Sequence, residues 1–116
     1  DTEDDVFDLS VLMSNFSEEK ALINNILNDF CEYLPDKLSA LKDACAKNDV
    51  PLVRHEAHAL KGSSGNIGAI ALQKIAGQIE NAAKSWDITG IGQLITQLDE
   101  QSEILLTAIK GLLSQE

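Results

Sequence analysis

A histidine followed three residues later by a lysine is the part of this sequence best suited to chemistry. On a helix, His58 and Lys61 would lie one turn apart, with Gly62 directly after them. A neutral imidazole nitrogen is a nucleophile, and histidine is among the side chains that form covalent intermediates. A nearby ammonium would stabilise the charge of a phosphoryl group on that nitrogen. The pair indicates phosphoryl transfer through histidine; the alternative is two ordinary surface residues.

The helix that carries this pair is predicted to place His58 away from the core. At 100° per residue, its core-facing side chains lie roughly 180–240° from His58; these are Val53, Leu60, Ser64 and Ile67. Glycine at an exposed mid-helix position costs roughly 1 kcal/mol, yet Gly62 and Gly65 follow His58 by one and two turns. Such departures from helix preference cluster at functional sites. Without a Cβ, Gly62 would leave room for a phosphoryl group and a partner.

Charge on the same face predicts a protein partner. Arg54, His55 and Lys61 form a cationic strip around His58, in a chain whose formal net charge is -10. We expect Arg54, His55 and Gly65 to belong to a docking surface for a protein. Nucleic acid and anionic lipid are poor partners for so acidic a chain. No apolar run approaches the roughly 18 residues that span a bilayer, so no direct membrane contact is expected.

The sequence does not predict a metal site or a disulfide. His55 and His58 are one residue closer together than in the His-Glu-x-x-His zinc motif, and the chain has no third histidine. Cys31 and Cys45 fall on one predicted helix, about 21 Å apart, which is too far for a disulfide. Unpaired thiols favour a reducing compartment. We therefore expect a cytoplasmic location, including that of the cytoplasmic end of a membrane-anchored sensor.

Helical periodicity runs through the whole chain, so the predicted fold is all-α. Four long amphipathic helices with short connections predict an antiparallel up-down four-helix bundle, preceded by a short extra helix over 8–15. The expected boundaries are an N-cap at Ser17, a kink at Pro35, an N-cap at Asp49 and an N-cap at Asp87, with Trp86 in the apolar seam of the fourth helix. Residues 1–116 are read as a single domain, frayed over 1–5.

The segment AHALKGSSGNIGA, residues 57–69, resembles the signature of histidine-containing phosphotransfer domains. That signature is His-x-x-Lys-Gly, then small residues, then a Gly-Ala pair, and the resemblance extends over roughly residues 6–113. It implies that His58 is the phosphorylated residue, through Nε2, that Lys61 supports the phosphoryl charge and that Gly62 clears the approach. It also implies that Glu80, on the next helix, accepts a hydrogen bond from the other ring nitrogen. The alternative for Glu80 is a solvated carboxylate at the bundle rim.

The resemblance further implies a relay in two-component signalling. His58 would accept a phosphoryl group from receiver-domain aspartates and donate it to them, the receivers belonging to response regulators or to a hybrid sensor kinase. The domain would be free-standing or part of such a kinase, without an ATP site of its own, and monomeric when isolated. Magnesium would be bound by the receiver. Two alternatives remain: the phosphoacceptor domain of a chemotaxis-type histidine kinase, and a purely structural bundle.

Overall fold

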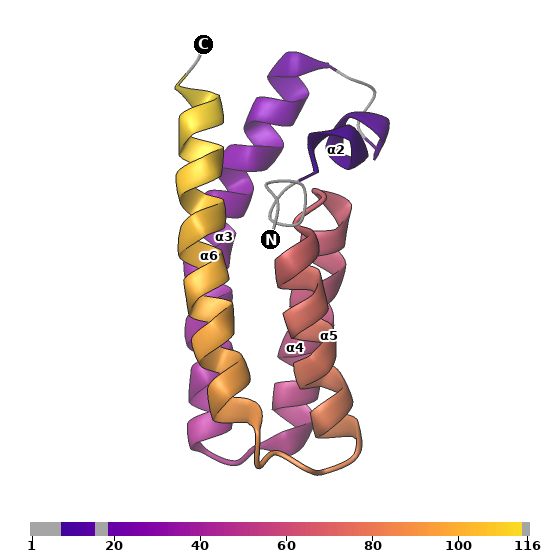
Figure 1. Ribbon diagram of the computed structural model, residues 1–116, viewed down its shortest axis with the longest axis vertical. Coiled ribbons are helices and arrows are strands. Elements are labelled where there is room, and N and C mark those ends of the chain that lie inside the picture. Colours follow the sequence, from indigo (N-terminus) through magenta and orange to yellow (C-terminus); the bar gives the residue numbers. More distant parts are fainter. Residues whose placement is uncertain (1–7, 16–18, 115–116) are drawn as a thin grey trace.

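The computed structural model describes residues 8–15 and 19–114, nearly all of them helical and none in a strand. The helices are α2 (Leu9–Asn15), α3 (Lys20–Ala46), α4 (Val50–Asn66), α5 (Ile70–Lys84) and α6 (Ile91–Leu113). The four long helices run up and down in turn, and α2 lies by the end where α4 turns into α5 (Figure 1). This arrangement confirms the predicted all-α, antiparallel four-helix bundle with a short additional helix at its N-terminal side.

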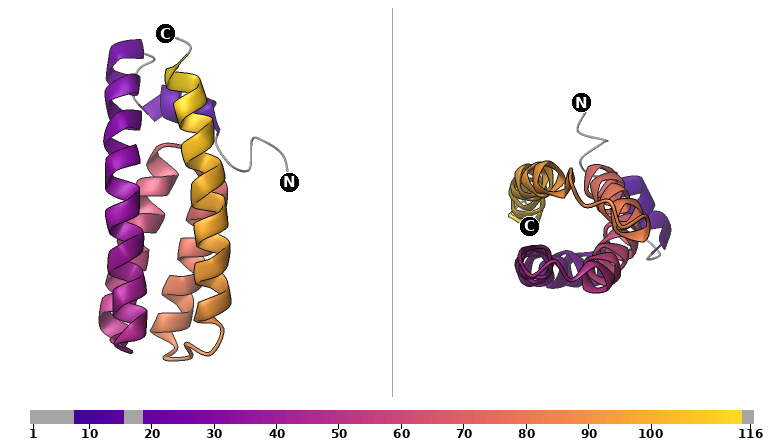
Figure 2. Two further views of the ribbon diagram at one scale, coloured as in Figure 1. Left: turned by 90° about the vertical axis from the view of Figure 1, so that its left-hand side faces the viewer. Right: turned by 90° about the horizontal axis from the view of Figure 1, so that it is seen from below.

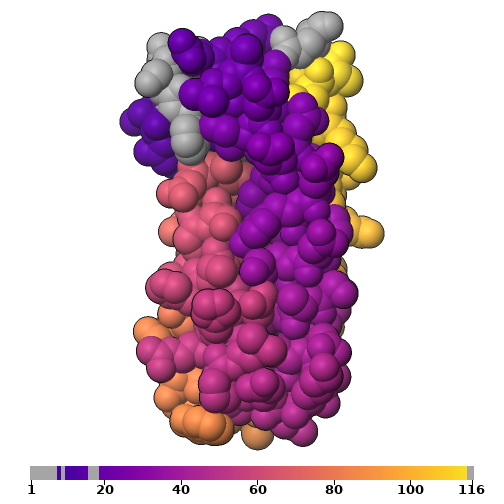
Figure 3. All heavy atoms as spheres, turned by 180° about the vertical axis from the view of Figure 1, so that it is seen from behind, coloured from indigo at the N-terminus to yellow at the C-terminus, as the bar shows by residue number. Residues whose placement is uncertain are grey.

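Aliphatic side chains from every helix build the core. Fully buried leucines and isoleucines come from all five helices, among them Leu12, Leu27, Leu60, Ile79 and Leu105. Seen along the bundle, α4 and α5 form one side, with α3 packed against α4 and α6 against α5 (Figure 2); the face formed by α3 and α4 is seen in Figure 3. Near the start of α3, Ile23 is buried whereas the adjacent Leu22 is 40% exposed.

The ends of α3, α4 and α5 share one turn geometry. Each helix is followed by a residue with positive φ: Asn48 at 54°, Gly68 at 79° and Trp86 at 58°. The next amide then donates to a carbonyl of the last helical turn, as Asp87 does to Ala82 at 3.0 Å. Glycine and asparagine are the usual residues at this point of the turn. The periodicity predicted Trp86 in the apolar seam of α5, and this prediction is wrong. Trp86 follows the helix and is 68% exposed.

The helix starts agree with the sequence at one position and differ at another. Asp49 caps α4 as predicted, accepting a hydrogen bond from the Leu52 amide at 3.2 Å. Asp87 does not cap α6, because its carboxylate accepts from Thr89, whose hydroxyl lies 2.7 Å away, and the helix begins only after Gly90.

Further along the chain, α3 continues through Pro35 without a break. Ser17 and residues 1–5 lie outside the described residues. Within the described ranges, no helix is long and apolar enough to cross a membrane.

Polar contacts between side chains also hold α4 against α3. Lys37 pairs with Glu56 at 2.9 Å and lies over the ring of Tyr33, while the Ser63 hydroxyl donates to the Tyr33 oxygen at 3.1 Å. The ion pair with Lys37 explains how the Glu56 carboxylate, whose side chain is only 12% exposed, is accommodated between the two helices. Cys31 and Cys45 are both on α3 and both unpaired.

Candidate functional site

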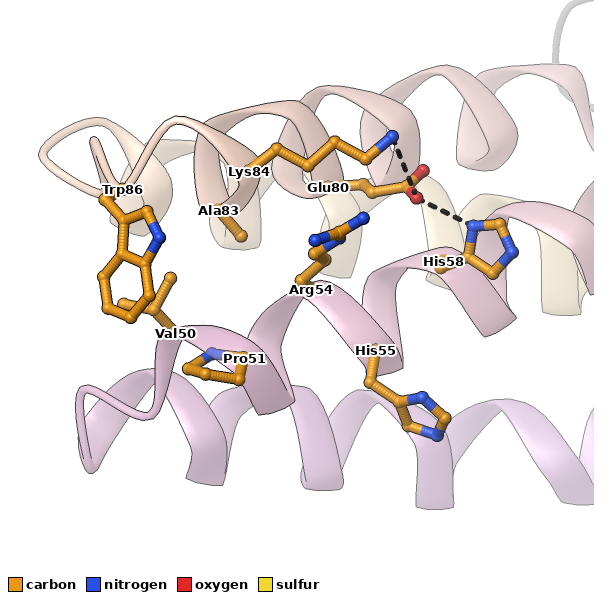
Figure 4. Close-up of a pocket in the computed structure, with 9 residues that line it drawn as sticks. All are labelled: Val50, Pro51, Arg54, His55, His58, Glu80, Ala83, Lys84 and Trp86. Atoms are coloured by element: carbon orange, nitrogen blue, oxygen red, sulfur yellow. Dashed lines mark hydrogen bonds and ion pairs between the residues drawn. The ribbon is translucent and has the colours of Figure 1, made fainter.

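His58 lies on the outer side of α4 and is held by a carboxylate from α5. Its side chain is 69% exposed, and its Nδ1 lies 2.7 Å from Oε2 of Glu80, whose side chain is only 3% exposed (Figure 4). An ionised carboxylate can only accept a hydrogen bond, so Nδ1 carries the proton and donates it. In the neutral ring this leaves Nε2 with a free lone pair.

Cations keep Glu80 ionised although it is buried. The Lys61 ammonium lies 2.6 Å from Oε1, and that of Lys84 lies 3.6 Å from Oε2. The close contact with the Lys61 ammonium is the main reason why the pKa of Glu80 falls from 4.5 to about 2; burial opposes it, and His58 and Lys84 add to it. Glu80 is therefore not a solvated rim carboxylate. His58, Lys61 and Lys84 converge on it, from two helices.

The two glycines after His58 have different surroundings. A Cβ added to Gly62 would meet no atom within 4 Å outside its own helix backbone, so the space beside it is open. A Cβ on Gly65 would lie 2.6 Å from the side-chain nitrogen of Gln73 on α5. Gly65 thus lies against α5 rather than on an open surface. Its expected place on the docking surface has less support than that of Arg54 and His55, which are both exposed.

A hollow of about 450 Å³ extends from His58 and Glu80 toward the turn after α5 (Figure 4). Arg54 and His55 line it, as do Val50 and Pro51 at the start of α4 and Ala83, Lys84 and Trp86 at the end of α5. Sequence reasoning missed Lys84 and Trp86 as site residues. Lys84 follows Glu80 by four residues, a spacing that brings side chains together on a helix and that could have revealed it. Trp86 gave no such signal, because its place depends on where α5 ends.

Gly77 is a further site residue that the sequence reasoning missed. A Cβ there would lie 3.4 Å from Cδ of Lys61, so the lysine stem crosses α5 over this glycine on its way to Glu80.

The described residues contain no group of three metal-ligating side chains.

The profile of the Hpt domain family matches residues 25–112 of the sequence. The chain belongs to the Hpt domain family. Among solved structures, histidine-containing phosphotransfer protein B (HptB) from Pseudomonas aeruginosa PAO1 is similar over 96% of both chains, with 25% identity and a TM-score of 0.90. The HPT domain of an Hpt sensor hybrid histidine kinase from Shewanella has the same fold over 98% of both chains, with 21% identity and a TM-score of 0.82. A search of curated protein sequences finds no significant match.

As an Hpt domain, the chain is a phosphorelay intermediate of two-component signalling. Hpt domains are phosphotransfer carriers rather than kinases, and they pair with receiver domains. The alternative of a chemotaxis-type phosphoacceptor domain is not favoured.

Proposed function

We propose that His58 is the residue of this domain that carries the phosphoryl group, on Nε2. The observation that supports it is the contact between His58 and Glu80: Nδ1 is occupied by an ionised carboxylate, while Nε2 is free on an exposed ring. The Nε2 lone pair attacks phosphorus of a receiver aspartyl phosphate, and the bond from phosphorus to the aspartate oxygen breaks. The aspartate leaves as a carboxylate. The reverse reaction returns the phosphoryl group to a receiver.

Two neighbours of His58 assist this step. The ring gains positive charge when Nε2 bonds to phosphorus while Nδ1 keeps its proton, and the buried Glu80 carboxylate stabilises that charge. Lys61, one turn further along α4, supplies an ammonium that supports the phosphoryl oxygens once it leaves its resting contact with Glu80. Gly62 leaves the approach open, because nothing occupies the space beside it.

The partners proposed are receiver domains of response regulators or of a hybrid sensor kinase, meeting a monomeric Hpt domain in the cytoplasm. Magnesium is held by the receiver. Arg54 and His55 lie on the face that the receiver approaches, since both line the hollow beside His58.

The central test compares the two histidines of the chain. His58→Gln should fold as the wild type does and accept no phosphate from a phosphorylated receiver, since glutamine has no nucleophilic ring nitrogen. His55→Gln is the matched control, because it removes a neighbouring exposed imidazole of the same helix and should still be labelled. Acid-labile, alkali-stable phosphate on each variant is the quantity to measure. Labelling that survives in His58→Gln would refute the assignment.

A further inference from the structure

Trp86 exposes a large apolar ring that the core does not use. It is 68% exposed, against 48% for Ile104, 40% for Leu22 and 38% for Leu52, the other exposed large hydrophobic residues that the structure describes. A tryptophan that is buried removes about 150–250 Å² from water, so most of that area remains uncovered here. Exposed apolar surface beside polar groups marks a site of interaction.

The backbone holds this ring in place at some strain. Trp86 has φ 58°, a left-handed conformation that is an outlier for a bulky residue. The same turn follows α3 and α4, where the chain places Asn48 and Gly68, two residue types that accept the conformation readily. The chain therefore departs from the usual choice only at the turn that borders the hollow. Strained residues of this kind are found mainly at functional sites.

Trp86 and His58 line opposite ends of one hollow (Figure 4). Val50, beside the ring, lies eight residues before His58 on α4, which corresponds to about 12 Å. A protein partner of ordinary size covers about 800 Å² on each side of an interface, enough to reach both ends. A protein that brings an aspartate to Nε2 of His58 would therefore also contact the indole ring.

Charge in the hollow favours an acidic partner. Arg54 and Lys84 lie between Trp86 and His58, and the one carboxylate there, Glu80, is already paired with Lys61. Arg54 and Lys84 make the hollow cationic in a chain of net charge -10, and the approaching surface must carry the negative charge of an aspartate. Tryptophan and arginine are also the residue types that most often dominate binding energy at interfaces.

We propose that Trp86 is the anchor on which the receiver domain docks while it exchanges the phosphoryl group with His58, a proposal that rests on the function proposed above. The docking surface then runs from His58 along α4 toward the turn after α5, and away from Gly65. Pro51 and the ring of Trp86 supply the apolar contact, and Arg54 and Lys84 supply the charge.

The variant Trp86→Asn tests this proposal without disturbing the fold, because asparagine already occupies the same turn at Asn48. Transfer rates should be measured against the concentration of a receiver that exchanges phosphate with the wild type. The concentration for half-maximal rate should rise about thirtyfold or more, as for loss of an interface hot spot, while the maximal rate stays within about twofold. Ile104→Ala, which removes an exposed side chain outside the hollow, is the matched control and should leave both values unchanged.

The fluorescence of Trp86 gives a second readout, because it is the only tryptophan in the chain. When a receiver that has no tryptophan of its own binds, the emission of Trp86 should shift to the blue and the indole should be protected from quenching by acrylamide. The affinity from this titration should match the one from the transfer rates. Unchanged rates in Trp86→Asn, or an indole that remains quenchable in the complex, would overturn the proposal. A shift that depends on the domain's own concentration, without a receiver, would also overturn it and point to a second copy of this chain.

Docking and chemistry are separable in this design. His58→Gln should still dock and shift the emission of Trp86, since the imidazole is not part of the apolar contact. If that variant docks but is also labelled, the assignment of His58 fails and the anchor stands. If it docks without the emission shift, the anchor fails and the assignment of His58 is untouched.

Discussion

Glu80 is the residue on which the state of the site depends. Its carboxylate accepts a hydrogen bond from the His58 ring and forms ion pairs with Lys61 and Lys84, and its side chain is almost completely buried. A buried carboxylate without partners would be forced toward its neutral form. Here Lys61 reverses that tendency and lowers the pKa to about 2. The ionised form in turn holds the proton on Nδ1 of His58, so one ion pair prepares the nucleophile.

Replacing Glu80 should separate its hydrogen bond from its charge. Glu80→Gln keeps an oxygen that can accept from Nδ1, so phosphoryl transfer should fall less than in Glu80→Ala, which leaves the ring unoriented. Initial rates of transfer from a phosphorylated receiver measure this difference. Equal rates in wild type and Glu80→Ala would show that the orientation of the ring does not matter.

The same carboxylate predicts how stability depends on pH. The pKa of Glu80 is lowered on folding, from 4.5 to about 2, so its ionisation stabilises the fold fully above about pH 4.5. That contribution is lost as the pH falls toward 2. The difference in unfolding free energy between wild type and Glu80→Gln should therefore shrink across this range. Urea denaturation in steps from neutral pH to about pH 2 tests it; a difference that does not change with pH would contradict the role of the ion pair.

At the scale of the helices, α4 and the turn that ends it make opposite demands on glycine. Gly62 lies within α4 and has open space where a Cβ would be. Gly68 ends the turn after α4 with φ 79°, and a Cβ there would collide with the backbone oxygen of Asp8. The Asp8 amide also donates to the Gly68 carbonyl at 2.7 Å, which joins the start of α2 to this turn. The first glycine is thus free to change without steric cost, whereas the second is required.

Alanine at each position should give stability changes of opposite sign. Gly62→Ala should raise the free energy of unfolding by roughly 0.5–1 kcal/mol, the difference in helix preference. Gly68→Ala should lower it by at least about 1 kcal/mol, because of the left-handed φ and the collision. The longer side chain of Gly62→Gln should also slow transfer by obstructing the approach to His58. Thermal denaturation and transfer assays measure both effects, and wild-type transfer by Gly62→Gln would rule out the access role.

For the whole molecule, the distribution of charge matters more than its total. The chain carries 19 acidic and 9 basic residues, yet Arg54, Lys61 and Lys84 gather around His58, where the buried Glu80 pairs with the two lysines. Exposed charge pairs contribute little and act only over about 8 Å at physiological salt. These three cations therefore orient a receiver at close range, while the apolar contact at Trp86 supplies the larger part of the affinity.

This charge pattern predicts where magnesium binds. Lys61 and Lys84 already pair with the Glu80 carboxylate, and their positive charge repels a divalent cation. The isolated domain should therefore show no tight magnesium site there. Transfer should nevertheless require magnesium, held by the receiver. Calorimetry of the isolated domain with magnesium, beside transfer assays with and without a chelator, tests both statements. A stoichiometric site that disappears in Glu80→Gln would contradict the first.

The amino-acid sequence by itself determined the features that depend on local geometry. The period of its apolar residues predicts the helices and the bundle, and the spacing of His58, Lys61 and Gly62 places them together on one outer face. These predictions succeed because an α-helix has a fixed number of residues per turn, whatever it packs against. The N-cap at Asp49 succeeds for a similar reason, since the residue bonds an amide three positions away.

Only the tertiary structure decided how α5 meets α4. Glu80 is 22 residues from His58, and the register between the two helices determines whether it meets the imidazole or water. The end of α5 and the start of α6 also appear only in the structure, because an aspartate such as Asp87 can either cap a helix or accept from a nearby hydroxyl, and here it accepts from Thr89. Trp86 could not be placed by periodicity for that reason. A residue just beyond a helix end takes its direction from the turn, and the turn is set by what the helices pack against.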